Sequence, residues 1–375
     1  MEFTVKVSIL GNYGHNNLGD EAILYGLVSL LDGMCEMVVF TESIERSKRQ
    51  KYSSEKVNLL YFREQFAGRI YRLPHIIFDM FKKILNTDVL IIGGGGLLNS
   101  SHPRSTIYYG LVALLSRIAR KKTIALGISV GPLDTRYSKV FAWIFFALCN
   151  EAYLRDEASF QFVKRLKICD CQLVPDLALA YKNNDKIVKY NRIALNVIPY
   201  FETDLWFEHN SAKAENYKHL ISNIIDYLLE TTDCEIALFS VDTRVDARSV
   251  DYFKSQHLEN DRITAFYPTT VDELKDIIAS AKIMIGSRLH ATVLAEAACT
   301  PFLALGYQEK VMNFSEDQQN KFAIHLERSD TKQAITLISQ LFNNINSEQD
   351  RCKLNRLGLD EQFAAFQENL KSVLR

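Results

Sequence analysis

The chain has 375 residues, 47% of them hydrophobic and 24% charged, with a formal net charge of −1. This length exceeds one ordinary domain and predicts two domains of about 180 residues each. The near-neutral charge excludes a global field that would attract nucleic acid or anionic lipid, so any basic site must be local.

The cellular compartment follows from what the sequence lacks. The N-terminal residues 1–11 lack a basic region followed by a long apolar one, so they predict a first strand and no signal peptide. The most apolar segments are far shorter than the roughly 20 residues that cross a bilayer. Seven scattered cysteines indicate reduced thiols, and the pair Cys169 and Cys171 lacks the second pair that a metal site needs. We therefore predict a cytoplasmic protein without a metal site.

Apolar runs of strand length alternate with helical patterns in the first half of the chain, which is typical of a parallel α/β sheet. The helix over 139–149 could be core, a dimer contact or a membrane-facing surface, and its aromatic content favours core. The expected strands are 5–10, 37–40, 59–61, 89–92, 123–126, 152–154 and 172–173, and the expected helices include 21–31, 107–120, 139–149 and 157–166.

A second alternation follows a polar segment, 182–192, which predicts a linker. We therefore predict an α/β protein of two Rossmann-like domains, 1–181 and 193–330, with an interdomain cleft and C-terminal helices over 331–375. The expected strands of the second half are 192–197, 235–239, 263–265, 282–285 and 301–305, and its main helices are 216–230, 245–254, 271–280 and 289–298.

The loop after the first strand, residues 11–22, is rich in glycine and asparagine. Such residues are costly unless the backbone needs positive φ or a close approach to a ligand. The glycine spacing matches neither a dinucleotide fingerprint nor a P-loop. The loop is either a ligand-free turn or, as its position favours, a cleft wall with Asn12, Gly14 and Asn17. Asp20 is either a helix cap or a functional carboxylate.

Two further loops carry candidate residues. Gly94 and Gly95, within the run 93–96, allow either close approach to a ligand or opposing loop, or tight crossing of strands, and Asn99 follows them. Arg155 points either into the cleft or, as we favour, to a structural carboxylate such as Asp176.

The segment 284–310 carries the most chemistry. An apolar run ends at Gly286, and a helical pattern begins near Leu289, which delivers Arg288 and His290 to a turn between strand and helix. Free backbone N–H groups and the helix dipole favour anions there. An arginine and an imidazole at this position indicate a phosphate or carboxylate ligand with His290 as proton donor, against the alternative that His290 merely caps or packs under the helix. Lys310 follows the next strand and is a further anion-contact candidate.

Seven short motifs, in order between residues 5 and 310, resemble the polysaccharide pyruvyl transferase family. They are 11–14 continuing to 17–22, the run 93–96 with Asn99, 127–132, 155–159, 175–178, 287–291, and Tyr307 with Lys310. The family often has a histidine after the strand matched by 235–239, whereas this chain has Ser240, Val241 and Asp242 there.

The resemblance implies a fold similar to the GT-B glycosyltransferases, with the acceptor on the first domain and phosphoenolpyruvate on the second. It implies transfer of a 1-carboxyethylidene group onto two sugar hydroxyls, which gives a cyclic ketal and phosphate. It implies His290 as general acid, with Arg288 and Lys310 around the donor. We count Ser287 and Arg155 as further donor contacts, and Asp20 as the group that orients or deprotonates the acceptor hydroxyl, with the cleft residues Asn12, Gly14, Asn17, Gly94, Gly95 and Asn99.

The resulting prediction is a pyruvyltransferase of surface-polysaccharide assembly, such as exopolysaccharide or capsule, with no cofactor beyond its donor substrate. Its partner is a saccharide acceptor, either free or lipid-linked at the inner face of the membrane, where the protein would be peripheral. Two alternatives stay open: a glycosyltransferase of the same architecture that uses a nucleotide sugar, and a non-catalytic carbohydrate-binding relative. The sequence sets no oligomeric state.

Overall fold

The computed structural model describes residues 5–52, 54, 56–61, 73–100, 103–181, 188–202 and 210–374. The chain forms two compact units, each built on one parallel sheet with helices. Unit 1 consists of Met1–His15, Asp20–Ala180 and Asp360–Arg375, and unit 2 consists of Asn16–Gly19 and Tyr181–Leu359. The predicted α/β fold class is confirmed by these two sheets.

Unit 1 has a seven-stranded sheet in the order β3-β2-β1-β4-β5-β6-β7, and all of its pairings are parallel. The apolar residues of the inner strands are buried because helices cover both faces of the sheet, whereas the edge strands β3 and β7 expose Leu60, Tyr61 and Leu173. The strands are β1 Lys6–Leu10, β2 Glu36–Thr41, β3 Val57–Tyr61, β4 Val89–Leu98, β5 Lys122–Val130, β6 Glu151–Leu154 and β7 Asp170–Leu173.

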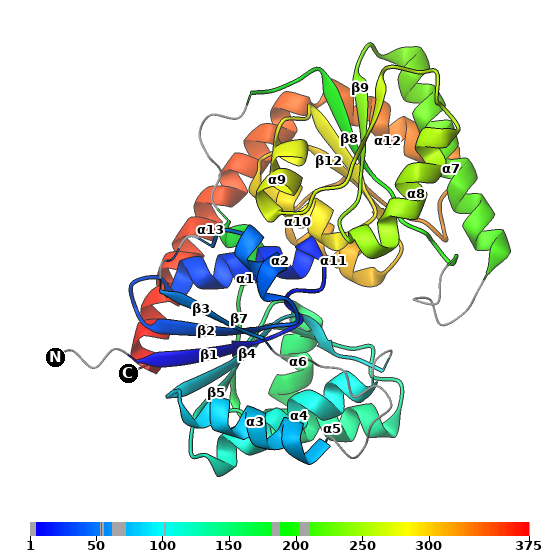
Figure 1. Cartoon of the computed structure of the whole chain (residues 1–375). Coiled ribbons are helices and arrows are strands. Elements are labelled where there is room, and N and C mark those ends of the chain that lie inside the picture. Colours follow the sequence, from blue (N-terminus) through cyan, green and yellow to red (C-terminus); the bar gives the residue numbers. More distant parts are fainter. Residues whose placement is uncertain are drawn as a thin grey trace. The chain divides into compact units, whose positions relative to one another are not determined.

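The helices of unit 1 form a layer on each side of this sheet. Figure 1 shows α1 and α2 on one face and α3, α4 and α5 on the opposite face. They are α1 Leu18–Leu31, α2 Ile44–Arg49, α3 Leu73–Leu85, α4 Pro103–Ile118, α5 Arg136–Leu148, α6 Glu157–Leu166 and the short 3-10 helix Leu177–Ala180.

The glycine run lies within a strand, whereas the sequence predicted that the strand would end before it. β4 continues through residues 93–96 to Leu98 and stays paired with β5, with a register shift between Gly95 and Leu98. Glycine is a weak strand former and often marks an irregularity within a strand, which agrees with the register shift here.

Unit 2 has a six-stranded parallel sheet in the order β10-β9-β8-β11-β12-β13. The sequence missed the last strand because it has only three residues. The strands are β8 Arg192–Asn196, β9 Glu235–Phe239, β10 Ile263–Phe266, β11 Ile283–Gly286, β12 Phe302–Gly306 and β13 Ala323–His325.

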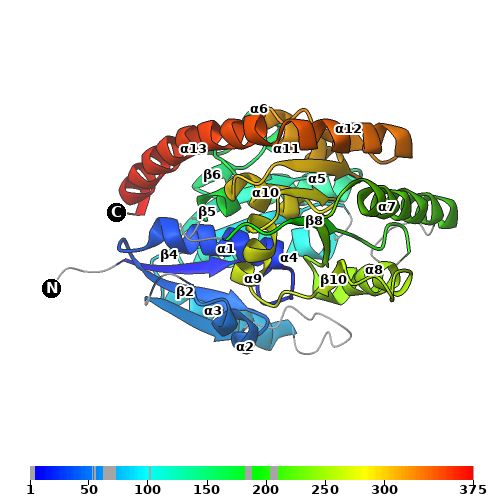
Figure 2. The same cartoon turned by 90° about the horizontal axis from the view of Figure 1, so that it is seen from above.

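Four helices of unit 2 begin at a side chain that caps them, whereas α10 and α11 have no side-chain cap. The side chains of Asn210, Asp242, Thr270 and Asp330 each accept a hydrogen bond from a first-turn N–H of the helix that follows. Figure 2 shows the two C-terminal helices in succession. The helices are α7 Ser211–Thr231, α8 Thr243–Ser255, α9 Val271–Ala279, α10 Leu289–Ala297, α11 Glu309–Asp317, α12 Thr331–Asn343 and α13 Ile345–Leu374.

Two segments outside the predicted domains join one unit or the other. From Asp360 onward α13 belongs to unit 1, where the Phe366 ring lies 5.0 Å from that of Tyr153 and Gln367 donates to the Leu30 carbonyl. Residues 182–187 of the predicted linker lie outside the described residues. Its remainder packs on unit 2, since Lys189 donates to the Ala281 carbonyl. No helix in the described ranges is both long and apolar enough to span a membrane.

Candidate functional site

The carboxyl edge of the unit 2 sheet is organised where the strand order reverses. β8 and β11 are neighbours, but their connections continue to opposite sides, toward β9 and β12. Loops diverge at such a point, and ligands of parallel α/β sheets bind there. Asn196 ends β8, is fully buried, accepts from the Arg288 N–H at 2.9 Å and donates to the Phe239 carbonyl. It therefore ties the turn after β11 to the end of β9.

The Arg288 guanidinium is held by a buried carboxylate, Asp246 of α8. Arg288 Nη2 lies 2.5 Å from Asp246 Oδ1, and Nε lies 3.2 Å from the same oxygen. Asp246 is fully buried and also accepts from the N–H groups of Val241 and Asp242. The arginine that the sequence placed at an anion site therefore already has one carboxylate partner.

This pairing leaves a second edge of the arginine. The edge formed by Nε and Nη2 faces Asp246. Within the described residues, Nη1 has no hydrogen-bond partner. The Arg288 side chain is 24% exposed. Burial acts to lower the pKa of Arg288, but the Asp246 charge outweighs it and raises the pKa, so the guanidinium stays charged. A fixed, charged fork with a second edge suits a carboxylate or phosphate ligand.

Ser287 serves the turn as a buried hydrogen-bonding group. Its hydroxyl lies 3.1 Å from the hydroxyl of Tyr217 on α7, which accepts from the Ile198 N–H. Burial raises the pKa of Tyr217, so this phenol stays neutral. Ser287 itself has no exposed surface, which supports a role in shaping the turn rather than the predicted donor contact.

His290 lies in the first turn of α10, and Gly19 packs against its imidazole. A Cβ on Gly19 would overlap His290 Nδ1. The segment Asn16–Gly19 is bonded to the loop after β9. The Leu18 N–H donates to the Val241 carbonyl at 3.1 Å, and Asn17 forms a bridge with Asp242. The cap position of α10 belongs to Arg288, so His290 is not its cap.

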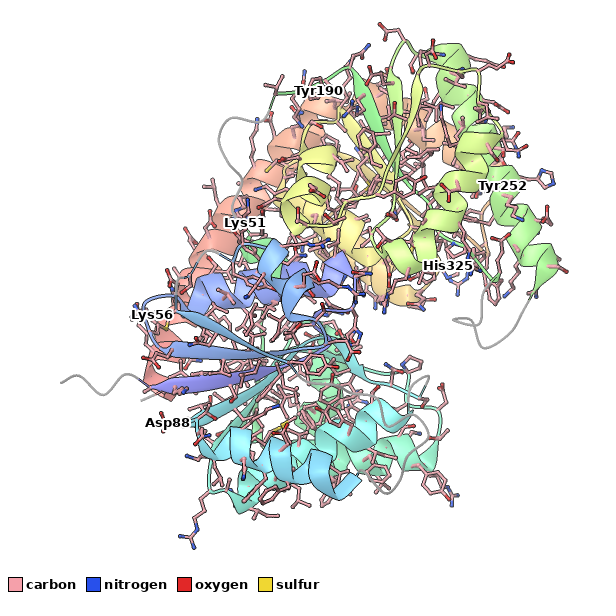
Figure 3. The ribbon with its side chains drawn as sticks, in the orientation of Figure 1. Lys51, Lys56, Asp88, Tyr190, Tyr252 and His325 are labelled. Carbon is pink, nitrogen blue, oxygen red and sulfur yellow. The ribbon has the colours of Figure 1, made fainter. Side chains whose placement is uncertain are left out.

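Two more residues lie at this sheet edge. Lys310 is exposed in the first turn of α11, which follows β12, as the sequence predicted. His325, labelled in Figure 3, ends β13, and its Nε2 lies 3.8 Å from Glu309 of α11. The sequence did not single out His325 because β13 itself was missed.

The corresponding edge of unit 1 brings the asparagine loop against the glycine run. Asn12 donates to Asp20 Oδ2 at 2.7 Å, and the Tyr13 hydroxyl donates to the Gly93 carbonyl. A Cβ on Gly94 would lie 2.6 Å from the Tyr13 hydroxyl, and one on Gly95 would lie 2.8 Å from Asp20 Oδ1. Both glycines have positive φ. Close approach to the opposing loop therefore explains Gly94 and Gly95, whereas a Cβ on Gly93 would lie 2.5 Å from the Leu126 carbonyl of the neighbouring strand β5, which is the tight crossing of strands that the sequence also allowed.

Asp20 is not the cap of α1, which was one of its two predicted roles. The helix begins at Leu18, and Asn17 before it accepts from the Gly19 N–H at 3.0 Å. The early start arises because the first turn tolerates the glycine once an asparagine caps it. Asp20 is buried and accepts from Asn12, and its role as a functional carboxylate stays a prediction.

Glu21 is a buried carboxyl that fixes the same loop. Its two oxygens accept from the Gly14 N–H at 2.6 Å and from the Tyr52 hydroxyl at 2.7 Å. Gly14 has φ of 82°, and a Cβ there would overlap Thr41 Oγ1. Burial raises the pKa of Glu21 to about 7, against the effect of both hydrogen bonds and with a contribution from the Asp20 charge.

The remaining predicted residues have structural partners. Arg155 Nη1 lies 2.7 Å from Asp176 and its Nε donates to Ser129, and both ionic side chains are almost fully buried. This confirms the predicted ion pair, and the geometry gives no support to Arg155 as a donor contact. Asn99 donates to the Gly96 carbonyl at 2.7 Å and so stabilises the turn that ends β4.

The sequence missed three residues that position the unit 2 site. They are Asn196, Tyr217 and Asp246, which reach the turn from β8, α7 and α8. The only signal in the sequence was their position near predicted strand ends or helix starts. Such positions do not show which distant turn a side chain meets.

Comparisons of the sequence with known proteins identify its family. The sequence model of the family described as "Polysaccharide pyruvyl transferase" matches residues 17–309. The amylovoran biosynthesis protein AmsJ of Erwinia amylovora is 21% identical over 362 residues, which cover 82% of this chain and 84% of that protein.

Solved structures share the fold. A putative UDP-N-acetylglucosamine 2-epimerase from Listeria monocytogenes has a TM-score of 0.65 at 10% identity, covering 93% of this chain and 91% of that chain. Anabaena Alr3699/HepE, solved in complex with UDP and glucose, has a TM-score of 0.63 at 10% identity, covering 99% of each chain. These neighbours establish a GT-B-like architecture.

Glu21 predicts a pH-dependent stability. Its folded pKa of about 7 exceeds the usual 4.5, so the folded chain keeps a proton that the unfolded chain releases between these values. The free energy of unfolding should therefore fall as pH rises from 5 to 8, by roughly 2–3 kcal/mol from this group. Glu21→Gln should remove that part of the slope in denaturant titrations. The exposed Glu45→Gln is the control, and an unchanged slope in Glu21→Gln would refute the assignment.

Gly19 predicts a steric coupling to His290. Gly19→Ala places a methyl group where the imidazole lies and should lower the free energy of unfolding by about 2 kcal/mol. His290→Ala in the same background should recover most of this loss, because the overlapping atoms are gone. Gly358→Ala, in α13 with open space around it, is the matched control. Equal losses in the single and double variants would contradict the contact.

Proposed function

Because this chain belongs to the polysaccharide pyruvyl transferase family, we propose that it transfers the enolpyruvyl group of phosphoenolpyruvate to a saccharide. The product is a cyclic pyruvate ketal on a sugar of a surface-polysaccharide intermediate, and phosphate is released. The observation that carries the proposal is the placement of Arg288 and His290, both inside the family match, at the switch point of the unit 2 sheet.

The donor has two anionic groups, and unit 2 has cationic and N–H groups for both. The second edge of Arg288 suits the planar carboxylate or a phosphate. The first N–H groups of α10 and its dipole favour an anion beside Arg288. Lys310 supplies a point charge from the first turn of α11, after the neighbouring strand. We assign the donor to this edge of unit 2.

His290 is the proposed general acid. Protonation of the methylene carbon of phosphoenolpyruvate gives a methyl group and a cation-like C2, which one sugar hydroxyl attacks. The C2–O bond to phosphate then breaks, and a second hydroxyl bonds to C2. Of the two protons that the hydroxyls lose, one replaces the proton that His290 gave to carbon, and the other leaves with phosphate. Imidazole titrates near neutral pH and can therefore give and regain this proton.

The acceptor roles of Asp20 and Asn12 stay predictions. The Asp20 carboxylate is hydrogen-bonded to Asn12, which keeps its direction fixed within unit 1. A fixed carboxylate suits the removal of a proton from a sugar hydroxyl. Arg155 has no part in this proposal, because its guanidinium is taken by Asp176 and Ser129.

The competing function is glycosyl transfer from a nucleotide sugar. The structural neighbours share the fold at identities near 10%, which carries no statement about this chain's ligand. The enzymatic nature of the family argues against a non-catalytic carbohydrate-binding relative. The donor therefore decides between the remaining alternatives.

Ligand-dependent stability and phosphate release test the proposal. Phosphoenolpyruvate at a hundred times its dissociation constant should stabilise the protein by about 2.7 kcal/mol. His290→Gln should keep this stabilisation but slow phosphate release by about a thousandfold, because only proton transfer is lost. His219→Gln, on the exposed surface of α7, is the control. Stabilisation by a nucleotide sugar alone would overturn the proposal.

Arg288→Lys tests the two-edged role of the arginine. A lysine can pair with Asp246 as a point charge but cannot offer a second edge to the donor. The variant should therefore fold, while its affinity for phosphoenolpyruvate falls about thirtyfold, the worth of one charge-assisted hydrogen bond. Arg244→Lys is the matched control. Arg244 pairs with Asp242 at the exposed start of α8, the helix that also carries Asp246. Unchanged affinity in Arg288→Lys would remove Arg288 from the donor site.

A further inference from the structure

One face of unit 1 exposes apolar side chains at positions where a surface helix usually has polar ones. On α4, Leu111, Leu114 and Ile118 are each between 39% and 60% exposed. Their spacing of three and four residues places them on a single side of the helix. The opposite side of α4 is buried in the core, as at Val112 and Ala113. The helix is therefore apolar on its solvent side as well.

The neighbouring helix repeats the pattern. On α5, Val140 and Trp143 are about half exposed, while Phe145 and Phe146 are fully buried. Tyr137, in the first turn, is 78% exposed. The sequence favoured core for this helix, and the structure divides it into a core side and an exposed aromatic side.

The third helix of this layer completes the face. Phe78 and Leu85 of α3 are exposed, and the Lys82 ammonium lies 4.6 Å from the centre of the Phe78 ring. α3 packs on α4 and α4 packs on α5, and Figure 1 shows the three in one layer. We call this surface the α3–α5 face, which consists of Phe78, Leu85, Leu111, Leu114, Ile118, Tyr137, Val140 and Trp143.

The charges around the face are mostly positive, although Asp79 of α3 and the exposed Asp134 before α5 are acidic. The sequences of α4 and α5 contain no Asp or Glu, whereas Arg117, Arg136 and Lys139 lie on or beside their exposed sides. Arg120 and Lys121 follow α4 directly. On α3, Lys82 and Lys83 outnumber Asp79, which pairs with Lys83. The chain as a whole has a net charge of −1, so this face is locally more positive than the chain average.

We infer that the α3–α5 face binds the surface of an anionic lipid bilayer. Exposed Trp, Tyr and Phe beside Lys and Arg are the groups that insert at the headgroup level and attract acidic lipids. The helices would lie in the plane of the surface. A second copy of this chain is the less suitable occupant, because a two-fold contact would set the basic residues of both faces against one another. The inference does not depend on the identity of the donor substrate.

Vesicle binding by the full chain tests the inference. Wild-type protein should float with vesicles of phosphatidylcholine and phosphatidylglycerol in equal parts, and bind vesicles of phosphatidylcholine alone far less. Arg117→Gln with Lys139→Gln should lower partitioning onto the anionic vesicles roughly thirtyfold, since each basic residue near the surface contributes about a factor of five. Lys332→Gln with Lys353→Gln, exposed on α12 and α13, is the matched control.

Trp143 reports the contact directly. The sequence has two tryptophans, so Trp206→Phe leaves Trp143 as the only emitter. Its emission should shift to shorter wavelength on anionic vesicles and stay unchanged with phosphatidylcholine. Absence of wild-type flotation, equal partitioning of both double variants, or an unshifted emission would each overturn the inference. A dimer that Trp143→Ser dissociates would assign the face to a second copy instead. None of these readouts uses phosphoenolpyruvate, so the transfer reaction is judged separately.

Discussion

The Asp246 carboxylate is the constraint on which the unit 2 site depends. It has no exposed surface and is bonded to Arg288 and to two backbone N–H groups after β9. A buried carboxylate without partners costs several kcal/mol, so displacement of any one partner is opposed by the loss of the others. The turn after β11, the loop after β9 and the first turn of α8 therefore behave as one electrostatic unit. The direction of Arg288 follows from that unit rather than from its own turn.

The two units reach a similar geometry by different chemistry. Both sheets reverse their strand order at one point. In unit 2 the side chain of Asn196 at the end of β8 bonds to the turn after β11, and in unit 1 the Tyr13 hydroxyl in the loop after β1 bonds to Gly93 of β4. Unit 2 fixes its turn with a charged pair. Unit 1 uses glycine backbone in the space that side chains would fill, and a buried carboxyl, Glu21, with a pKa near neutrality. An anionic donor requires fixed positive charge, whereas a neutral sugar requires hydrogen-bonding groups. The proposed division of roles between the units matches this contrast.

Patterns that act through neighbours in sequence were predictable, and contacts through space mostly were not. Continuous apolar runs predicted parallel, covered strands, and Arg155 with Asp176 was predicted because both lie at predicted strand ends, which the structure shows to be adjacent in the sheet. The glycines of β4 were taken for a loop, because a single strand does not show that its neighbour will complete its hydrogen bonds. Asp246 was missed because it is an ordinary first-turn acid by spacing, and its partner Arg288 lies 42 residues away. Such a pair exists only once the sheet order is known.

The net charge of single helices says more about binding partners than the net charge of the whole chain. The net charge of −1 excludes a strong field around the whole molecule. The helices α4 and α5, which contain no acidic residue, still form a locally positive surface. This is possible because a charge acts over roughly a Debye length of 8–10 Å and not over the whole molecule. For the same reason exposed Trp143 indicates a binding surface and exposed Leu258 does not. Trp143 lies among basic residues and other exposed apolar side chains, whereas Leu258 lies in the polar loop 256–261. Unit 1 thus carries both the predicted acceptor residues and the surface that would meet a lipid-linked acceptor. A saccharide carried on lipid is the substrate for which that combination has a physical use.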